Sequence, residues 1–352
     1  MADLWENPMG TDGFEFVEYA APDPNALGAL FEDMGFERVG EHRSKDVRLY
    51  RQGEAHFIVN AEPDSFGQSF ARVHGPSVCA LGIRVQDAAS AYQRALELGA
   101  WAVPAQPGPM ELAIPAIKGI GDSLLYFVDR YGDQGTIYDV DFKRTDGDRA
   151  GAGSTLLGID HLTHNVHRGR MEEWAEFYER LFNFREIRYF DIEGKLTGLR
   201  SKAMTSPCGK IRIPINESSD DQSQIEEYLH AYRGEGIQHI ALSTNDIHAS
   251  VESLKRRGVR FLDTPDAYYD ALDERIPGHG QDLDRLRENG VLVDGAPTKG
   301  DGLLLQIFTE NVIGPIFFEL IERQGNEGFG EGNFQALFES MEQDQIDRGA
   351  LS

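Results

Sequence analysis

An internal repeat constrains the fold of this chain more than any other feature. The chain restarts one pattern four times: an apolar strand-like segment, a helix-like segment, then further strand-like segments. The four restarts are GFEFVEY, PSVCALGIRV, GIDHLTHNV and GIQHIALSTN. A repeated unit cannot bury its apolar face alone, so the copies must pack against one another. The sequence therefore predicts an α+β protein built from four βαβββ modules.

The modules fall into two halves. Residues 144–154, RTDGDRAGAGS, are polar and rich in glycine, which is typical of a linker. They separate residues 1–143 from residues 155–352, and a length of 352 residues also favours two domains. Two modules in each domain predict an open half-barrel around a concave interior. Each domain is expected to end in a strand pair, LLYFVDR with TIYDVDF and LLLQIFT with IFFELIE.

Composition narrows the class of partner. The formal net charge is −25, a sign that repels nucleic acid and anionic membranes. An anionic substrate would need local positive charge, which a divalent metal can supply. The N-terminus has no signal-peptide pattern, and no apolar run is long enough to span a membrane. Cys79 and Cys208, without a CxxC motif, are typical of a reduced protein. We expect a cytoplasmic protein with neither nucleic-acid nor membrane partners.

Three of the strand-like stretches contain candidate metal ligands: His161, His239 and Glu319. Strand periodicity turns His164 to the face opposite His161 and separates Glu319 from Glu322 in the same way. Two imidazoles and one carboxylate are the ligand set of non-haem Fe(II) oxygenases, and they also serve catalytic zinc. Taken singly, a buried glutamate can instead pair with a basic residue, and a strand histidine can be a hydrogen-bonded core residue.

The segments around these residues, with the C-terminal run GNEGFGEGNFQALFESMEQDQIDRGAL, resemble the 4-hydroxyphenylpyruvate dioxygenase family. The resemblance covers almost the whole chain and implies the vicinal-oxygen-chelate, or glyoxalase-like, fold. It implies one Fe(II) per chain, because zinc cannot give up the electrons that O2 activation needs. It also implies conversion of 4-hydroxyphenylpyruvate and O2 to homogentisate and CO2 in tyrosine and phenylalanine catabolism. Members are commonly oligomeric, so a dimer or tetramer is expected.

The same resemblance implies a substrate pocket around the metal. Its residues would be Ser201, Asn216, Gln224, Gln238, Gln306, Phe308, Phe329, Asn333 and Phe334. From residue type alone, the serine and Asn216 could serve local hydrogen bonding, Gln224 could be exposed, and the phenylalanines could fill a core. An apolar stripe from Phe334 onward predicts an amphipathic helix over residues 334–346. We expect this helix to act as a lid over the pocket.

Aligning the two halves places Phe16 opposite His161, Ala80 opposite His239, and Asp139 opposite Glu319. The N-terminal domain is therefore expected to hold no metal. Two other functions remain open at this point. A hydroxymandelate synthase would share the fold, the metal and the substrate but would oxygenate the side chain of the substrate instead of its ring. In this chain, Asn216 in the sequence PIN favours ring hydroxylation. A non-catalytic binding module of the same fold would not need the three ligands.

Overall fold

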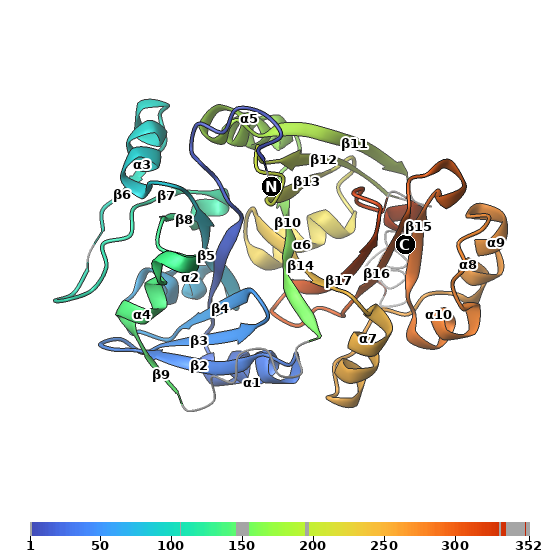
Figure 1. The fold of residues 1–352 in the computed structure, drawn as a ribbon, viewed down its shortest axis with the longest axis horizontal. Coiled ribbons are helices and arrows are strands. Elements are labelled where there is room, and N and C mark those ends of the chain that lie inside the picture. Colours follow the sequence, from blue (N-terminus) through green and yellow to red (C-terminus); the bar gives the residue numbers. More distant parts are fainter. Residues whose placement is uncertain are drawn as a thin grey trace.

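The computed structural model describes residues 2–105, 107–145, 155–193, 197–330, 332–335 and 349. The described strands form two curved sheets that lie side by side, one from each half of the chain (Figure 1). The strand order is β6-β7-β8-β5-β1-β4-β3-β2-β9 in the first sheet and β11-β12-β13-β10-β14-β17-β16-β15 in the second. Apart from β9, one order is the reverse of the other, as an internal duplication requires.

The elements follow the predicted module pattern. The first sheet contains β1 (Phe14–Ala20), β2 (Glu37–His42), β3 (Val47–Gln52), β4 (Ala55–Asn60), β5 (Ser77–Arg84), β6 (Ala102–Val103), β7 (Ala116–Lys118), β8 (Leu124–Val128) and β9 (Phe142–Arg144). The second contains β10 (Leu156–Val166), β11 (Arg185–Glu193), β12 (Gly198–Thr205), β13 (Arg212–Ser218), β14 (Gly236–Thr244), β15 (Leu292–Gly295), β16 (Leu303–Phe308) and β17 (Phe317–Gln324).

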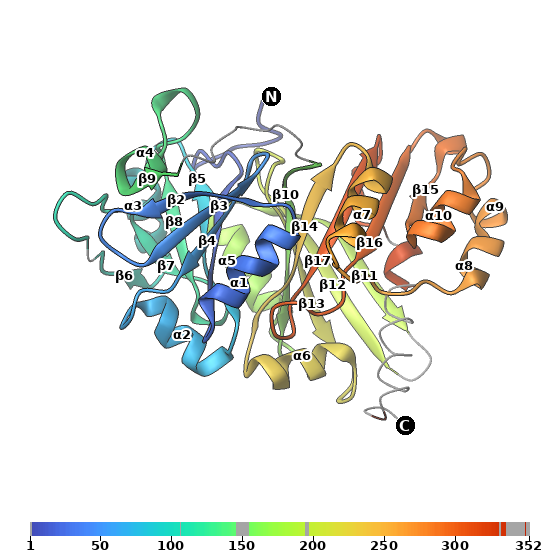
Figure 2. The ribbon, with the colours of Figure 1, turned by 90° about the horizontal axis from the view of Figure 1, so that it is seen from below.

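One helix follows the first strand of each module. These helices are α1 (Pro24–Asp33), α3 (Ala88–Glu97), α5 (Met171–Phe182) and α7 (Ile247–Arg256). The four βαβββ modules are confirmed. Two further helices, α2 (Phe66–His74) and α6 (Gln224–Tyr232), join the modules within each half and lie on the same side of the molecule (Figure 2). The last module also carries α8 (Asp266–Asp270), α9 (Leu272–Arg275) and α10 (Leu283–Asn289).

One apolar core joins the two sheets. It includes side chains from the helices and strands of both halves, and Phe57 of β4 stacks on Phe318 of β17 with ring centroids 5.8 Å apart. Phe127 of β8 packs near Phe182 of α5 at 6.0 Å. The concave interiors hold separate, smaller clusters. Among the described residues, no helix has both the length and the apolar character needed to cross a membrane.

The prediction that TIYDVDF is a strand paired with LLYFVDR is wrong. Its first part forms α4 (Ile137–Asp141), because Thr136 and Asp139 form a reciprocal capping box that starts a helix. Its end forms β9, which pairs with β2 and not with β8. Ile137 and Tyr138 pack with Phe16, so α4 fills the interior of the first sheet.

Two other predicted segments extend beyond the described residues. Arg144 still belongs to β9, and the Thr145 N–H donates to the carbonyl of Val39 at 3.0 Å. The rest of the predicted linker, residues 146–154, lies outside the described residues. The predicted lid helix is described as helical only at its start, and residues 336–346 lie outside the description.

Candidate metal centre

His161, His239 and Glu319 meet on adjacent strands, β10, β14 and β17. Ala241 of β14 is the ladder partner of both His161 and Glu319, so the three side chains project on one face. The Glu319 Oε2 lies 3.2 Å from Nε2 of His161 and 3.3 Å from Nε2 of His239. The two Nε2 atoms are 3.4 Å apart, and each residue is 2% exposed. Their potential ligand atoms all lie within 4.8 Å of one another, as one bound ion requires.

The faces predicted from strand periodicity agree with the contacts. His164 Nε2 hydrogen-bonds the hydroxyl of Tyr178 on α5 at 2.7 Å, away from the three ligands. Glu322 accepts from the N–H of Ile247 at the start of α7 at 2.8 Å. Both residues therefore serve packing outside the sheet interior, and among the described residues the predicted three are the group that converges at the centre.

A β-bulge precedes each histidine ligand. In the ladder between β10 and β14, Asp160 and Gln238 have no partner of their own. A bulge residue can turn its side chain to the same face as its neighbour. Consequently Asp160 Oδ1 lies 2.9 Å from Nδ1 of His161, and Gln238 Oε1 lies 3.0 Å from Nδ1 of His239. Each imidazole is held by the residue directly before it.

Electrostatics fit a cation at this point. Burial raises the pKa of the Glu319 carboxyl, but the imidazoles of His161 and His239 lower it, to about 2 on balance. Burial also lowers the pKa of His161, whereas the carboxylates of Glu319 and Asp160 raise it overall. A buried carboxylate that converges on two imidazole nitrogens is a nitrogen-and-oxygen donor set suited to a divalent transition metal. The residues present therefore fit such an ion.

Several predicted pocket residues contact the ligands or their supports. The Gln306 amide donates to Glu319 Oε1 at 2.8 Å and to the carbonyl of Phe329 at 3.2 Å. Asn333 in turn donates to Gln306 Oε1 at 2.9 Å. Gln238 donates to Gln224 Oε1 at 2.9 Å, and Gln224 is buried rather than exposed. These amides hold the candidate metal ligands in orientation.

Ser201 and Asn216 are ladder partners on β12 and β13, and Asn165 of β10 is the ladder partner of Asn216. All three are buried, and the Ser201 Oγ, Asn216 Oδ1 and Asn165 Nδ2 atoms have no hydrogen-bond partner within the described part of the chain. Each such atom costs about 1–3 kcal/mol. A cluster of them on neighbouring strands indicates a place for a polar ligand group.

Sequence reasoning missed Asn165 and Thr163. Both share a strand face with His161 by alternation, and that periodicity was the signal that could have found them. Thr163 Oγ1 lies 2.9 Å from Nε2 of His239, directly at the candidate metal position. The row from His161 through Thr163 to Asn165 thus connects the ligands to the unpaired polar atoms.

Aromatic rings surround the ligands. Phe329 meets His161 edge-on with ring centroids 5.7 Å apart, and Phe308 lies 6.4 Å from His239. Phe317, not predicted to contact a ligand, stacks on His239 at 4.8 Å. Phe334 instead stacks on Phe190 of β11 at 5.9 Å. The structure thus brings two of the three predicted phenylalanines against the ligands, and the third against a neighbouring strand.

The first sheet carries different residues at the matching positions. Its register pairs Phe16 with Gly82, Glu18 with Ala80, and Gly82 with Tyr126. These pairs correspond to His161 with Ala241, Thr163 with His239, and Ala241 with Glu319. Tyr126 therefore matches Glu319, and the alignment of Asp139 with it is wrong because Asp139 lies in α4.

The rings of Phe16 and Tyr126 occupy this place in the first sheet, with centroids 5.8 Å apart. A Cβ on Gly82 would approach the Phe16 ring within 2.6 Å, so glycine leaves room for that ring. The matching position in the second sheet is Ala241, which lies among ligands rather than under a ring.

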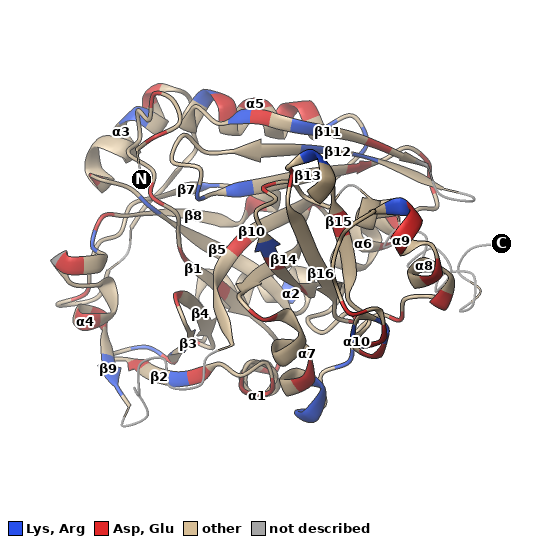
Figure 3. Cartoon of the chain, turned by 45° about the vertical axis from the view of Figure 1, so that its right-hand side comes forward, with Lys and Arg blue, Asp and Glu red and all other residues tan. Residues whose placement is uncertain are grey.

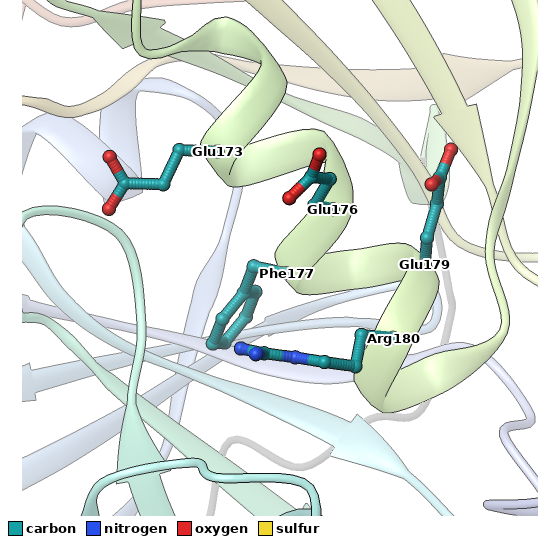
Figure 4. Close-up of a pocket in the computed structure, with 5 residues that line it drawn as sticks. All are labelled: Glu173, Glu176, Phe177, Glu179 and Arg180. Carbon is teal, nitrogen blue, oxygen red and sulfur yellow. The ribbon is translucent and has the colours of Figure 1, made fainter.

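A separate hollow lies along α5. It is lined by Glu173, Glu176, Phe177, Glu179 and Arg180, with the carboxylates spaced along the helix (Figure 4). None of these residues belongs to the metal centre. Acidic residues also mark the other outer helices (Figure 3), in agreement with the net charge of −25. The hollow is therefore part of an acidic surface and not of the buried centre.

Comparisons with known proteins agree with the geometry. Residues 5–143 match the family described as "Hydroxyphenylpyruvate dioxygenase, HPPD, N-terminal", and residues 158–274 match the "Glyoxalase/Bleomycin resistance protein/Dioxygenase superfamily". The chain is 63% identical to Hemolysin VllY of Vibrio vulnificus (strain CMCP6), covering 98% of both chains. It is 57% identical to 4-hydroxyphenylpyruvate dioxygenase of Pseudomonas sp. (strain P.J. 874), covering 100% of this chain and 99% of that one. A solved triple mutant of 4-hydroxymandelate synthase from Streptomyces coelicolor superposes with a TM-score of 0.83 at 28% identity, covering 96% of this chain and 100% of the other.

Proposed function

Because the chain belongs to the 4-hydroxyphenylpyruvate dioxygenase family, we propose that His161, His239 and Glu319 hold its catalytic iron. The enzyme is an Fe(II)-dependent dioxygenase that converts 4-hydroxyphenylpyruvate and O2 to homogentisate and CO2. One observation carries the assignment of the ligands: three buried ligand atoms of the required types lie within 4.8 Å of one another.

The ligand set also explains how an acidic protein attracts an anionic substrate. A bound Fe(II) would be held by His161, His239 and Glu319, and it would supply an electron-donating ion that can activate O2. Two neutral imidazoles and one carboxylate leave a formal local charge of +1 on the centre. The keto-acid end of the substrate is thus drawn to the centre although the chain as a whole carries −25.

For the rest of the pocket, we assign the ring end of the substrate to the polar row. A phenol hydroxyl donates one hydrogen bond and accepts others, and Ser201, Asn216 and Asn165 offer unpaired atoms of both kinds. Phe308 and Phe329 flank the ligands and supply apolar contact for the aromatic ring. Burial of these groups would exclude bulk water from the reacting atoms.

Gln224, Gln238, Gln306 and Asn333 are assigned a supporting role beside the pocket. Their contacts run to His239 and Glu319, so they orient ligands as well as border the substrate. Phe334 belongs with the segment that we propose continues into the lid helix. Closure of such a segment would keep water from the reacting atoms.

The domain arrangement is part of the proposal. Residues 1–143 would form a domain without iron, supported by Phe16, Ala80 and Tyr126 at the positions that match the ligands. Residues 155–352 would form the catalytic domain with its C-terminal lid, joined through residues 144–154. Trp101 and Met110 are 74% and 95% exposed, and we propose that homo-oligomers of two or four chains form. The free thiols of Cys79 and Cys208 support a cytoplasmic location.

The ligand assignment is tested by Fe(II) binding to His161→Ala, His239→Ala and Glu319→Ala. Each variant should lose homogentisate formation and lose Fe(II) affinity by more than the roughly 10–100-fold that removal of a supporting residue costs. His164→Gln is the matched control, because His164 lies on the same strand but faces α5. It should bind one Fe(II) per chain. Full turnover with one iron in any alanine variant would remove that residue from the ligand set.

A further inference from the structure

Asp160 and Arg323 form an ion pair directly behind a candidate metal ligand, with a buried carboxylate and a partly buried guanidinium. Arg323 Nε and Nη2 donate to the two carboxylate oxygens of Asp160, each at 2.8 Å. Asp160 Oδ1 also lies 2.9 Å from Nδ1 of His161. Asp160 is 8% exposed. A two-pronged contact of this kind fixes the plane of the carboxylate, and the carboxylate then fixes the plane of the imidazole.

The same guanidinium also holds the segment that leads into the aromatic wall. Arg323 Nη1 donates to the carbonyl of Gly328 at 2.6 Å and to that of Asn326 at 3.2 Å. Phe329 follows at once and meets the His161 ring edge-on. Arg323 lies four residues after Glu319 on β17, so strand alternation places both on one face. One strand therefore provides a ligand and the anchor of a second ligand.

The two histidine supports differ in charge. Gln238 holds His239 with a neutral amide, whereas Asp160 holds His161 with a carboxylate. A carboxylate that accepts from Nδ1–H keeps the Nε2 lone pair free for a metal and makes it a stronger donor. Arg323 compensates the carboxylate, because an unpaired buried charge would be costly.

We propose that Asp160 and Arg323 are positioning residues of the metal centre, which together fix His161 for iron and hold Phe329 against it. This inference rests on the proposed function, since it needs His161 to be a ligand. Neither residue touches substrate or iron in this role. Their contribution is a preformed orientation of one ligand and of the adjacent pocket wall.

The first test measures Fe(II) affinity of the whole protein by competition with a chelator. Asp160→Asn should lose about 10–100-fold in affinity, the usual cost of removing a support of a metal ligand. The visible spectrum of the Co(II)-loaded variant should also change, because it reports the geometry of the ligands. Unchanged Fe(II) affinity together with an unchanged Co(II) spectrum would overturn the role of Asp160.

A charge-balanced variant separates positioning from folding. Asp160→Asn alone leaves the partly buried Arg323 without the carboxylate that it contacts, whereas Asp160→Asn combined with Arg323→Gln removes both charges. The double variant should fold and still show the loss of Fe(II) affinity. Recovery of wild-type affinity in the double variant would overturn the proposal. His161→Ala distinguishes a failure of the positioning role from a failure of the ligand assignment. If this variant keeps full Fe(II) affinity, the ligand assignment itself has failed.

Arg323→Lys tests whether Arg323 holds Phe329 against the metal centre. It retains the charge but cannot contact Asp160 and two carbonyls at once. We expect it to release more CO2 than homogentisate, because Phe329 is less firmly held. Arg212→Lys is the matched control: Arg212 reaches Asp160 Oδ2 at 3.4 Å but otherwise pairs with the exposed Glu327. It should keep both affinity and product ratio. Equal CO2 and homogentisate from Arg323→Lys would contradict this part.

Discussion

Gly330 lies against the Gln306 side chain that supports Glu319, and it leaves no room for a side chain of its own. Its φ is +75°, a region that favours glycine, and an added Cβ would lie 2.0 Å from Oε1 of Gln306. Gln306 holds Glu319, and its carbonyl oxygen accepts from Asn333. The position therefore needs glycine for both its backbone and its surroundings.

Gly330→Ala should displace the Gln306 amide and lower both Fe(II) affinity and turnover. Gly325→Ala is the control, because Gly325 also has a positive φ (+87°) but its nearest contact would be 3.8 Å away. Both variants should lose about 1 kcal/mol in the free energy of unfolding from backbone strain. Only Gly330→Ala should change metal affinity. Equal metal affinity in the two variants would mean that the Gln306 contact does not support the centre.

His164 gives a prediction about pH. Burial lowers its pKa to about 3, whereas histidine in an unfolded chain titrates near pH 6.5. Below pH 6.5 the unfolded chain therefore takes up a proton that the folded chain does not, so acid lowers the free energy of unfolding until about pH 3. Between pH 7 and pH 5 this residue should account for about 2 kcal/mol.

In denaturant unfolding, the free energy of unfolding of His164→Gln should therefore fall less between pH 7 and pH 5 than that of the wild type, by about that amount. An identical fall in His164→Gln and the wild type would show that His164 does not stay neutral in the fold.

At the scale of elements, α4 is what makes the two sheet interiors different. It turns Ile137 and Tyr138 into the interior of the first sheet, where they pack with Phe16. The second sheet keeps the corresponding space for the ligands and the polar row. The capping box at Thr136 and Asp139 starts this short helix.

Thr136→Ala should lower the free energy of unfolding by roughly 0.5–2 kcal/mol, the usual cost of losing such a cap. Thr136→Ser retains the hydroxyl and should be close to the wild type. Fe(II) affinity should be the same in both, because α4 belongs to the other sheet. A large loss of iron binding in Thr136→Ala would mean that the first domain takes part in holding the metal.

The C-terminal segment can be divided at Asn333. A chain that ends after residue 335 keeps the hydrogen bond from Asn333 to Gln306, whereas a chain that ends after residue 332 loses it. The first truncation should keep iron but release CO2 without an equal amount of homogentisate, since the proposed lid is gone. The second should also bind Fe(II) less tightly. An unchanged homogentisate yield in both truncated chains would contradict the proposed lid. Equal Fe(II) affinity in the two chains would contradict the supporting role of Asn333.

The repeat pattern and strand alternation were enough to predict the four modules and the outward-facing His164 and Glu322, whereas the three candidate ligands were predicted from alternation together with the family resemblance. It was not enough for α4, because the alternating IYDVD stretch suits a strand as well as a helix until its cap is considered. Bulges also escape periodicity: Asp160 reaches the imidazole of His161 only because one residue is inserted in the ladder. Contacts between distant segments, such as Arg323 with Asp160, depend on register that a single sequence does not specify.

At the scale of the whole molecule, one duplicated fold carries one metal centre. The two sheets share strand order and module pattern, yet only the second has imidazoles and a carboxylate at the three matching positions. The first has Phe16, Ala80 and Tyr126 there. The first sheet instead contributes to the apolar core that it shares with the second sheet, where β4 contacts β17. We therefore expect iron to titrate to one ion per chain.

Product analysis tests this account most directly. The protein, loaded with Fe(II), is incubated with 4-hydroxyphenylpyruvate and O2, and the aromatic products and CO2 are quantified beside the iron content. We predict one iron per chain and equal amounts of homogentisate and CO2, all lost in Glu319→Ala. 4-Hydroxymandelate as the main product, or homogentisate formed by Glu319→Ala, would contradict it.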